Sequence, residues 1–290
     1  MPGSPVVRPL AEADVAAAFD VSTSAFDALD AANHRPSESL TEERTRHGHA
    51  RIAHLLETDP AGSWVAADGE SVVGVALALR REQVWGLSLL TIHPRFQSIG
   101  LGRRLLDAAL AYGQECRGGI ILSSDDPRAM RRYARAGFSL LPGVRAVGEV
   151  RAALEPTEEV RPATVSDLEL CAVASRAVRG AAHTADVRLA LEEGYHVVVA
   201  DRPTGVGFAV HRDGTPVLLA ATRPAIAADL LRACLAAGTA RVGVYYVTHA
   251  QPWAIDVALD AGLSIEPHGP VFVRGDVGPM TPYLPSAAYL

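Results

Sequence analysis

The first half of the chain alternates between the residue patterns of strands and of helices. Short apolar runs bounded by turn residues predict strands. These runs cover residues 5–8, 63–67, 71–80, 84–92 and 119–124. After the fourth run, Leu101, Leu105, Ala108 and Tyr112 recur at helical spacing, and Gly113 marks the end of that predicted helix. The pattern therefore predicts an α/β fold in which helices flank a sheet.

A second helix is predicted by its end signals. In "DPRAMRRYARAG", Asp126 is suited to cap the helix, Pro127 to occupy its first turn, and Gly137 to terminate it. The following "FSLLPGV" leads into a last strand. The first half therefore ends in a strand, a helix and a further strand.

The second half repeats the first. Three pairs of similar segments occur in the same order, namely 7–15 with 160–168, 64–77 with 197–210, and 134–140 with 259–265. Their common order indicates a diverged duplication. Pro156 and a charged run separate the copies, so we place the boundary near Glu155. Two domains are expected, 1–155 and 156–290, each of ordinary domain size.

Composition narrows the class of protein. The 290 residues are 49% hydrophobic and 21% charged, which predicts a packed globular chain, and we find no run long enough to cross a bilayer. The start of the chain does not resemble a secretory signal. A formal net charge of −6 argues against nucleic-acid binding. Three widely spaced cysteines match no metal site and indicate reduced thiols, so we expect a cytoplasmic location and no metal.

The stretch "HPRFQSIGLGRRLL" places glycines between a predicted strand and a predicted helix. Gly100 and Gly102 lack a Cβ, so a ligand can approach the main chain where the helix presents free N–H groups. The spacing matches neither a P-loop nor a dinucleotide fingerprint. Local physics therefore predicts a site for pyrophosphate or a similar anion. A tight turn chosen for close packing is the alternative.

Two motifs taken together indicate a particular protein family, which the glycine segment alone does not. Gln97, Gly100 and Gly102 resemble the acetyl-CoA-binding segment of the GNAT superfamily of N-acetyltransferases. Downstream, Tyr133 followed by Gly137-Phe138 resembles the closing motif of the same family. The chain is thus identified as a tandem GNAT member. The implied fold is two GNAT-like domains, each with a mixed, mostly antiparallel central sheet flanked by helices.

The resemblance implies a role for each matching residue. Main-chain groups of Leu90, Thr91 and Ile92 would bind the pantetheine arm and polarise the thioester carbonyl. Tyr133 would hydrogen-bond the thioester sulfur and protonate the leaving thiolate. The pyrophosphate would be held by N–H groups of the segment formed by Gln97, Ser98, Ile99, Gly100, Leu101, Gly102 and Arg103.

The chain departs from the family pattern at two places. Residues before the first glycine are often basic in that family, but here they are Ser98 and Ile99. The compensating charge is expected from Arg95, Arg103 or Arg104. The family often has an Asn that touches the pantetheine arm seven residues before the Tyr. Here that position is Asp126, for which a role as a plain helix cap is the alternative.

The second copy lacks the chemical groups of the first. Pro94 aligns with Pro224, but the glycine corner between strand and helix is missing after Pro224. Tyr133 aligns with Ala258. We therefore expect a degenerate domain without catalysis that shapes the acceptor pocket. A ligand site of its own is the alternative.

The base that accepts a proton from the acceptor is not identified by the sequence. Candidates are His47, His49, Glu82 and His93, and ordinary surface or turn roles are the alternative for each. The apolar tail raises another candidate. In some multidomain members of the resembled family the terminal carboxylate is the base, and here that is the carboxylate of Leu290.

These observations predict an acyl-CoA-dependent N-acyltransferase that uses acetyl-CoA as co-substrate. The acceptor is expected to be a primary amine of a small molecule. A non-catalytic acyl-CoA-binding or regulatory protein and an O-acyltransferase are the alternatives. We expect no nucleic-acid or membrane partner, and a monomer or a homodimer.

Overall fold

A computed structural model describes residues 4–37, 39–151, 154 and 159–290. By spatial compactness the chain divides into two units. Unit 1 comprises Met1–Arg80 and Trp85–Cys116, and unit 2 comprises Arg81–Val84 and Arg117–Leu290. The two copies in the sequence, the first half and the second half, do not coincide with these units.

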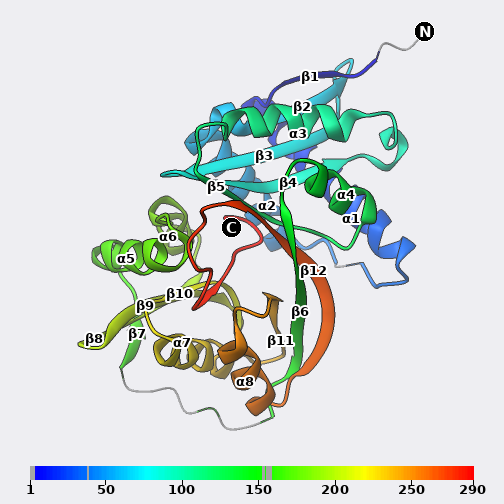
Figure 1. Cartoon of the computed structure of the whole chain (residues 1–290). Helices are drawn as coiled ribbons and strands as arrows, with labels where there is room; N and C mark the ends of the chain where they lie inside the picture. Colours follow the sequence, from blue (N-terminus) through cyan, green and yellow to red (C-terminus); the bar gives the residue numbers. More distant parts are fainter. Residues whose placement is uncertain (1–3, 38, 152–153, 155–158) are drawn as a thin grey trace. The chain divides into compact units, whose positions relative to one another are not determined.

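Unit 1 contains strands whose neighbours follow the order β1-β2-β3-β4 (Figure 1). The strands are β1 (Val6–Pro9), β2 (Ser63–Asp68), β3 (Ser71–Arg81) and β4 (Val84–Ile92), and the helices are α1 (Val15–Ala32), α2 (Glu42–Thr58) and α3 (Leu101–Tyr112). Pairing of β1 with β2 and of β2 with β3 is antiparallel. The sequence placed β4 and α3 correctly, because both carry strong apolar patterns.

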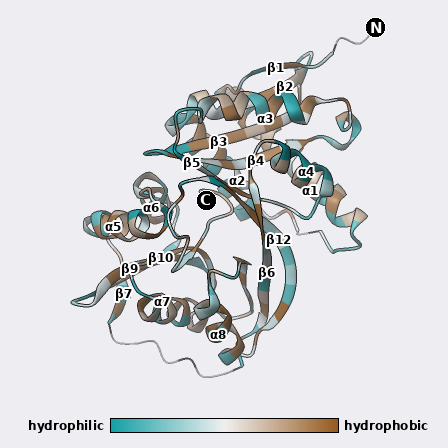
Figure 2. Cartoon of the chain, in the orientation of Figure 1, coloured by the Kyte–Doolittle hydropathy of each residue, from teal (hydrophilic) through white to brown (hydrophobic). Residues whose placement is uncertain are grey.

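The core of unit 1 lies between its sheet and α3. Leu105, Leu106 and Ala109 of α3 are buried, and β3 is hydrophobic along most of its length (Figure 2). Trp85 of β4 is fully buried and its Nε1 donates a hydrogen bond to the Ala109 carbonyl, 3.0 Å away. This bond and the apolar packing fix the direction of α3 relative to β4, and hence the turn that connects them.

Unit 2 contains two runs of neighbouring strands. Their orders are β5-β12-β6-β11 and β13-β10-β9-β8-β7. The strands are β5 (Gly118–Leu122), β6 (Ser139–Glu149), β7 (Val160–Pro162), β8 (His196–Arg202), β9 (Gly205–Arg212), β10 (Thr215–Ala221), β11 (Arg241–Val247), β12 (Ser264–Gly275) and β13 (Tyr283–Leu284). The helices are α4 (Pro127–Arg135), α5 (Leu168–Arg179), α6 (Thr184–Glu192), α7 (Pro224–Ala236) and α8 (Pro252–Asp260). The expected α/β class with mostly antiparallel sheets is confirmed.

The two halves exchange their last strands within unit 2. β12 belongs to the second half, yet it pairs with β5 and with β6 of the first half (Figure 1). In return, β6 pairs with β11 of the second half. All three pairings are antiparallel. Strands of the two copies therefore alternate in the order β5-β12-β6-β11.

Local geometry supports the duplication. In the first half Arg8 donates two hydrogen bonds to Asp14, at 2.6 and 2.9 Å, and Asp14 also accepts the Ala11 N–H. Arg161 and Asp167 form the same two-bond pair in the second half, at 2.9 and 2.7 Å. The helices α4 and α8 both begin with Pro and are followed by a glycine of positive φ.

The proposed sequence boundary at Glu155 lies outside the described residues. The compact units follow spatial contact, whereas the boundary follows sequence repeats. Domains 1–155 and 156–290 therefore stay a prediction about the duplication.

The repeated Arg–Asp pair yields a stability prediction. We expect Asp14→Asn to lower the free energy of unfolding by about 1–2 kcal/mol at neutral pH, because a charged acceptor of several hydrogen bonds is lost. The Arg8 hydrogen bonds hold the pKa of Asp14 below its ordinary value of 3.8. The difference in free energy of unfolding between wild type and Asp14→Asn is therefore largest at neutral pH, and it is lost as the pH falls through that lowered pKa.

Urea denaturation at several pH values measures this difference. Asp167→Asn is the matched variant in the second half, and the exposed Asp260→Asn is a control that should leave stability unchanged. Equal stability of Asp14→Asn and wild type at pH 7 would contradict the prediction.

Candidate functional site

The turn between β4 and α3 has a defined backbone shape. A single 3-10 turn, Pro94–Phe96, leads to Ser98 and Gly100, whose φ values are 68° and 90°. A non-glycine residue at positive φ is uncommon, so this turn is shaped by more than local preference. The side chain of Gln97 donates a hydrogen bond to the Ile92 carbonyl, at 3.1 Å. Gln97 therefore stabilises the turn through a hydrogen bond to the end of β4.

The turn offers main-chain donors to an anion. Among the hydrogen bonds of the described residues, the N–H groups of 98–102 have no backbone acceptor. A Cβ built on Gly100 meets no atom within 4 Å, so the space beside the glycine is open. Free N–H groups at a helix start, next to open space, bind phosphate groups well.

The arginines around the turn have different tasks. Arg104 donates to the Pro5 carbonyl at 2.8 Å and so ties α3 to the start of the chain. The side chain of Arg103 is 81% exposed and forms a surface ion pair with Asp107 at 3.5 Å. Arg95 is exposed. Arg103 and Arg95 are therefore the arginines with the freedom to reach a phosphate.

The end of β4 contains an orphaned polar atom. Thr91 is buried, and its Oγ1 has no hydrogen-bond partner among the described residues. Leu90 and Ile92 on either side are half-buried. A buried hydroxyl without a partner is costly, and a bound ligand with amide groups would satisfy it. This atom and the open cradle at Gly100 fit the pantetheine and phosphate parts of acetyl-CoA.

In unit 2, Asp126 is the cap of α4. Its carboxylate accepts the Arg128 N–H at 2.8 Å and is also bound by the Arg128 guanidinium, with the shortest contact at 2.8 Å. Burial alone would raise the pKa of Asp126, but these hydrogen bonds hold it below the ordinary value. This geometry agrees with the alternative interpretation of Asp126 as a plain helix cap.

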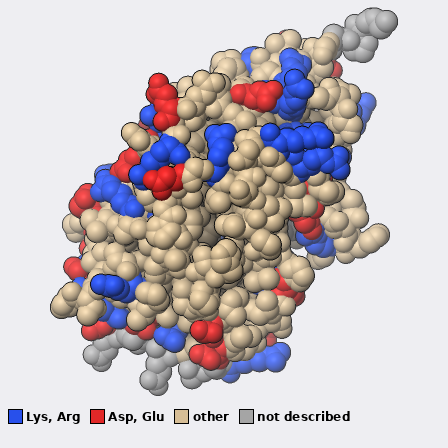
Figure 3. All heavy atoms as spheres, viewed as in Figure 1, with Lys and Arg blue, Asp and Glu red and all other residues tan. Residues whose placement is uncertain are grey.

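Basic side chains gather over α4 (Figure 3). The helix carries Arg128, Arg131, Arg132 and Arg135. Such a surface favours the approach of an anionic ligand. The motif resemblance gave no sign of this, although the four arginines are visible in the sequence.

Tyr133 lies on the buried face of α4. Its side chain is 5% exposed, and its ring meets the edge of Phe272 with centroids 5.5 Å apart. Burial raises the pKa of the phenol well above its ordinary value of 10.0, against a smaller opposing effect of Arg132. Nearby Asp126 and Tyr246 raise it further. The phenol therefore carries its proton at neutral pH.

Sequence reasoning missed the residues that the second half places around Tyr133. Phe272 is on β12, and Tyr246 is on β11 at a positive φ of 55°. His268 of β12 packs on Tyr246, with ring centroids 4.6 Å apart, and on Tyr245 at 5.4 Å. Phe272 reaches Tyr133 only through the strand exchange, for which the sequence carries no local signal.

The four candidate bases all have structural contacts. His47 lies 3.9 Å from Glu43, and His49 packs edge-on against Phe19. Glu82 is bonded to Arg176 at 2.7 Å, and Nδ1 of His93 accepts the Arg95 N–H at 3.3 Å. No single one stands out, so the base stays unassigned among them.

The side chain of Leu290 is fully buried. It belongs to an apolar cluster of unit 2 with Val178, Met280 and Tyr283. Its N–H donates to the Ser286 carbonyl at 2.7 Å. The chain end is therefore held firmly within unit 2, and a catalytic role for its carboxylate stays a prediction.

The second half contains other residues at the matching positions. α7 starts directly at Pro224 after Arg223, without a glycine turn. Ala258 stands where Tyr133 stands in the first half, and it is fully buried. Gln251 takes the place of Asp126.

Two negative findings concern the described residues. No helix there is both long and apolar enough to cross a membrane. No group of three or more His, Cys, Asp or Glu side chains there is arranged to hold a metal ion.

Comparison with known proteins connects this geometry to a family. Residues 27–138 match the model of the acetyltransferase (GNAT) family. No curated protein sequence matches the chain. The fold is similar to that of a Pyrococcus horikoshii protein assigned as an acetyltransferase, at 14% identity and a TM-score of 0.80, covering 99% of this chain and 96% of that one.

Two further crystal structures share the fold over nearly the whole chain. A GCN5-related N-acetyltransferase from Sphaerobacter thermophilus has 16% identity and a TM-score of 0.61, with 95% of this chain and 96% of that chain covered. A tandem GNAT protein of the clavulanic acid biosynthesis pathway has 15% identity and a TM-score of 0.55, with 93% and 98% covered. At these identities the likeness concerns the fold.

The open space at Gly100 yields a binding prediction. We expect Gly100→Val to weaken acetyl-CoA binding by about tenfold or more, which is about 1.4 kcal/mol, because the side chain would fill the space that the phosphates need. Gly69→Val is the matched control, since Gly69 also has a positive φ and open space around a built Cβ. Calorimetric titration compares the two, and equal affinities would contradict the prediction.

Proposed function

We propose that this chain, whose residues 27–138 belong to the GNAT acetyltransferase family, transfers an acetyl group from acetyl-CoA to a primary amine of a small molecule. The observation that carries the proposal is the buried Tyr133 on α4, the helix capped by Asp126. A protein that only binds acyl-CoA has no use for a proton donor of this kind. The main-chain donors at 98–102 support the same function.

Each part of the first half has a separate task in this proposal. The N–H groups at 98–102 bind the pyrophosphate, with Arg103 or Arg95 adding charge. Main-chain groups of Leu90–Ile92 orient the pantetheine arm, and one N–H stabilises negative charge as it develops on the carbonyl oxygen. Acetyl-CoA supplies the acetyl group as a thioester.

Tyr133 supplies the proton that the leaving group needs. The amine nitrogen attacks the carbonyl carbon, the carbon–sulfur bond breaks, and the Tyr133 Oη–H protonates the sulfur. The amine loses one proton to a base or to water, which restores the balance and leaves an amide and a free thiol. Burial holds the pKa of Tyr133 above its ordinary value, so the phenol is protonated when the amine attacks.

The second half has a supporting task in the proposal. It has Ala258 in place of the tyrosine and lacks the glycine turn, so it carries no acyl transfer. It provides Phe272, which packs on Tyr133, and the neighbouring Tyr246 and His268. The Phe272 contact restricts the rotation of the Tyr133 ring.

Replacement of the acid tests the function directly. We expect Tyr133→Phe to lower kcat by about 100-fold or more while acetyl-CoA affinity stays unchanged, since general acids contribute roughly that much. A thiol-release assay with a panel of small amines measures the rate, and Tyr195→Phe is a control elsewhere in unit 2. A Tyr133→Phe enzyme with undiminished turnover would overturn the role of Tyr133.

Extension of the chain end tests the proposed carboxylate base. A single Gly added after Leu290 moves the carboxylate by one residue. If that carboxylate accepts the amine proton, turnover falls by about tenfold or more and acetyl-CoA affinity is retained. A Leu290→Val variant keeps the carboxylate in place and serves as the packing control. Unchanged turnover of the extended chain would exclude Leu290.

A further inference from the structure

We infer that the C-terminal segment Val277–Leu290, here called the tail, occupies in the second half the groove that corresponds to the pantetheine groove of the first half. The inference rests on the proposed function, because that function assigns the pantetheine arm to the end of β4. The tail and all the residues that contact it here lie within unit 2.

The tail forms a strand on the free edge of β10. β13 pairs with β10 in antiparallel register, with Tyr283 opposite Ala220 and Leu284 opposite Leu219. The Ala221 N–H donates to the Pro282 carbonyl at 3.1 Å. β11 follows β10 in the second half, yet it belongs to the other run of strands. β10 and β11 therefore belong to different sheets, although the Gly243 N–H of β11 donates to Thr215 Oγ1 at the start of β10, at 3.2 Å. At the other end of β10, the tail takes the hydrogen bonds of the strand edge.

The paired residues are those that correspond to the proposed pantetheine site. Pro94 aligns with Pro224, and the same alignment places Leu90–Ile92 on Ala220–Thr222. The tail pairs with Leu219–Ala221, so the two stretches overlap. Pantetheine contains two amide groups along an extended chain. A peptide strand presents the same donors and acceptors at similar intervals, so one edge can accept either.

The cap of α8 contacts the tail in the way expected for an arm-binding amide. Gln251 corresponds to Asp126, the position at which the resembled family often has an Asn on the pantetheine arm. The Gln251 side chain is buried, and its Nε2 donates to the Met280 carbonyl at 2.6 Å. Its Oε1 accepts the Thr248 N–H at 2.8 Å, which orients the amide. The second half thus retains an amide donor here and uses it on its own chain.

Apolar packing anchors the tail along its length. Tyr283 and Leu290 are fully buried, and Met280 and Leu284 are 7% and 3% exposed. The Met280 N–H donates to the Val178 carbonyl at 2.8 Å. These side chains fill the space that a ligand arm would need.

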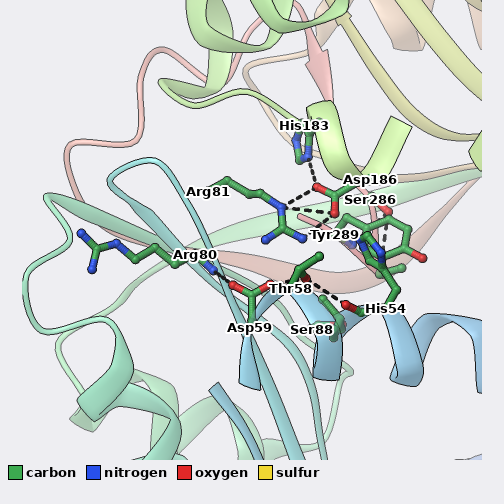
Figure 4. A network of polar contacts seen from close by, with 12 residues as sticks. His54, Thr58, Asp59, Arg80, Arg81, Ser88, His183, Asp186, Ser286 and Tyr289 are labelled. Carbon is green, nitrogen blue, oxygen red and sulfur yellow. Dashed lines mark hydrogen bonds and ion pairs between the residues drawn. The ribbon is translucent and has the colours of Figure 1, made fainter. Parts of the chain in front are cut away.

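A buried polar cluster holds the tyrosine of the tail. The Tyr283 hydroxyl lies 2.8 Å from Nε2 of His183, whose Nδ1 lies 3.2 Å from Asp186. Asp186 is bound by Arg81, with the shortest contact at 2.6 Å (Figure 4). Burial and the nearby Arg179 cation lower the pKa of His183 to about 4, so its ring is neutral and hydrogen-bonds on both sides. The tail is therefore a built-in occupant of the groove.

Exchange of the tail in a nicked protein tests the inference. A protease site inserted between Gly275 and Asp276, both exposed, allows the full chain to fold before it is cut. A fluorescent peptide of residues 277–290 then replaces the native tail, and its polarisation is followed during titration with S-acetylpantetheine. We expect displacement of at least half of the peptide at saturating S-acetylpantetheine. A peptide with Tyr283→Asp and Leu284→Asp is the control and should not bind.

Retention of the labelled peptide at every concentration of S-acetylpantetheine would overturn the inference. If the nicked chain does not release its tail, calorimetric titration of the uncut protein with acetyl-CoA tests the inference instead. One equivalent of acetyl-CoA per chain is expected, and two equivalents with the tail in place would overturn the inference. Peptide displacement together with zero equivalents of acetyl-CoA would instead contradict the proposed function, so the two failures are distinguishable.

Discussion

The antiparallel pairing of β12 with β5 and β6 is the constraint on which the rest of unit 2 depends. It brings Phe272 of the second half against Tyr133 of the first, and so sets the environment of the proposed acid. It also places β6 against β11, which leaves the edge of β10 free for the tail. Separation of the halves would break all of these hydrogen-bonded pairs at once.

Features determined by neighbouring residues were predictable from the sequence. Asp126, Pro127 and Gly137 define α4 because caps, first-turn prolines and terminal glycines act over three or four residues. β4 was bounded correctly because a continuous apolar run predicts a buried strand. The partner of β12 was not predictable, because strand periodicity specifies which face is buried and not which strand lies alongside.

The candidate site likewise contains features that were predictable from the sequence and features that were not. The turn at Gly100 and the tyrosine helix came from motifs, whose residues lie within one short segment each. The cluster of Tyr246 and His268 and the contact of Gln251 with the tail depend on side-chain packing and long-range pairing. The orphaned Thr91 hydroxyl is likewise a property of burial, which no residue pattern near it indicates.

The strand exchange also determines when the protein can become complete during its synthesis. The ribosome releases Tyr133 and α4 early, but Phe272 follows only after more than a hundred further residues, near the end of the chain. Until then, the nascent first half has an open edge at β5 and an uncovered tyrosine ring. A chain truncated before Ser264 therefore lacks β12, and Tyr133 loses the ring that packs against it.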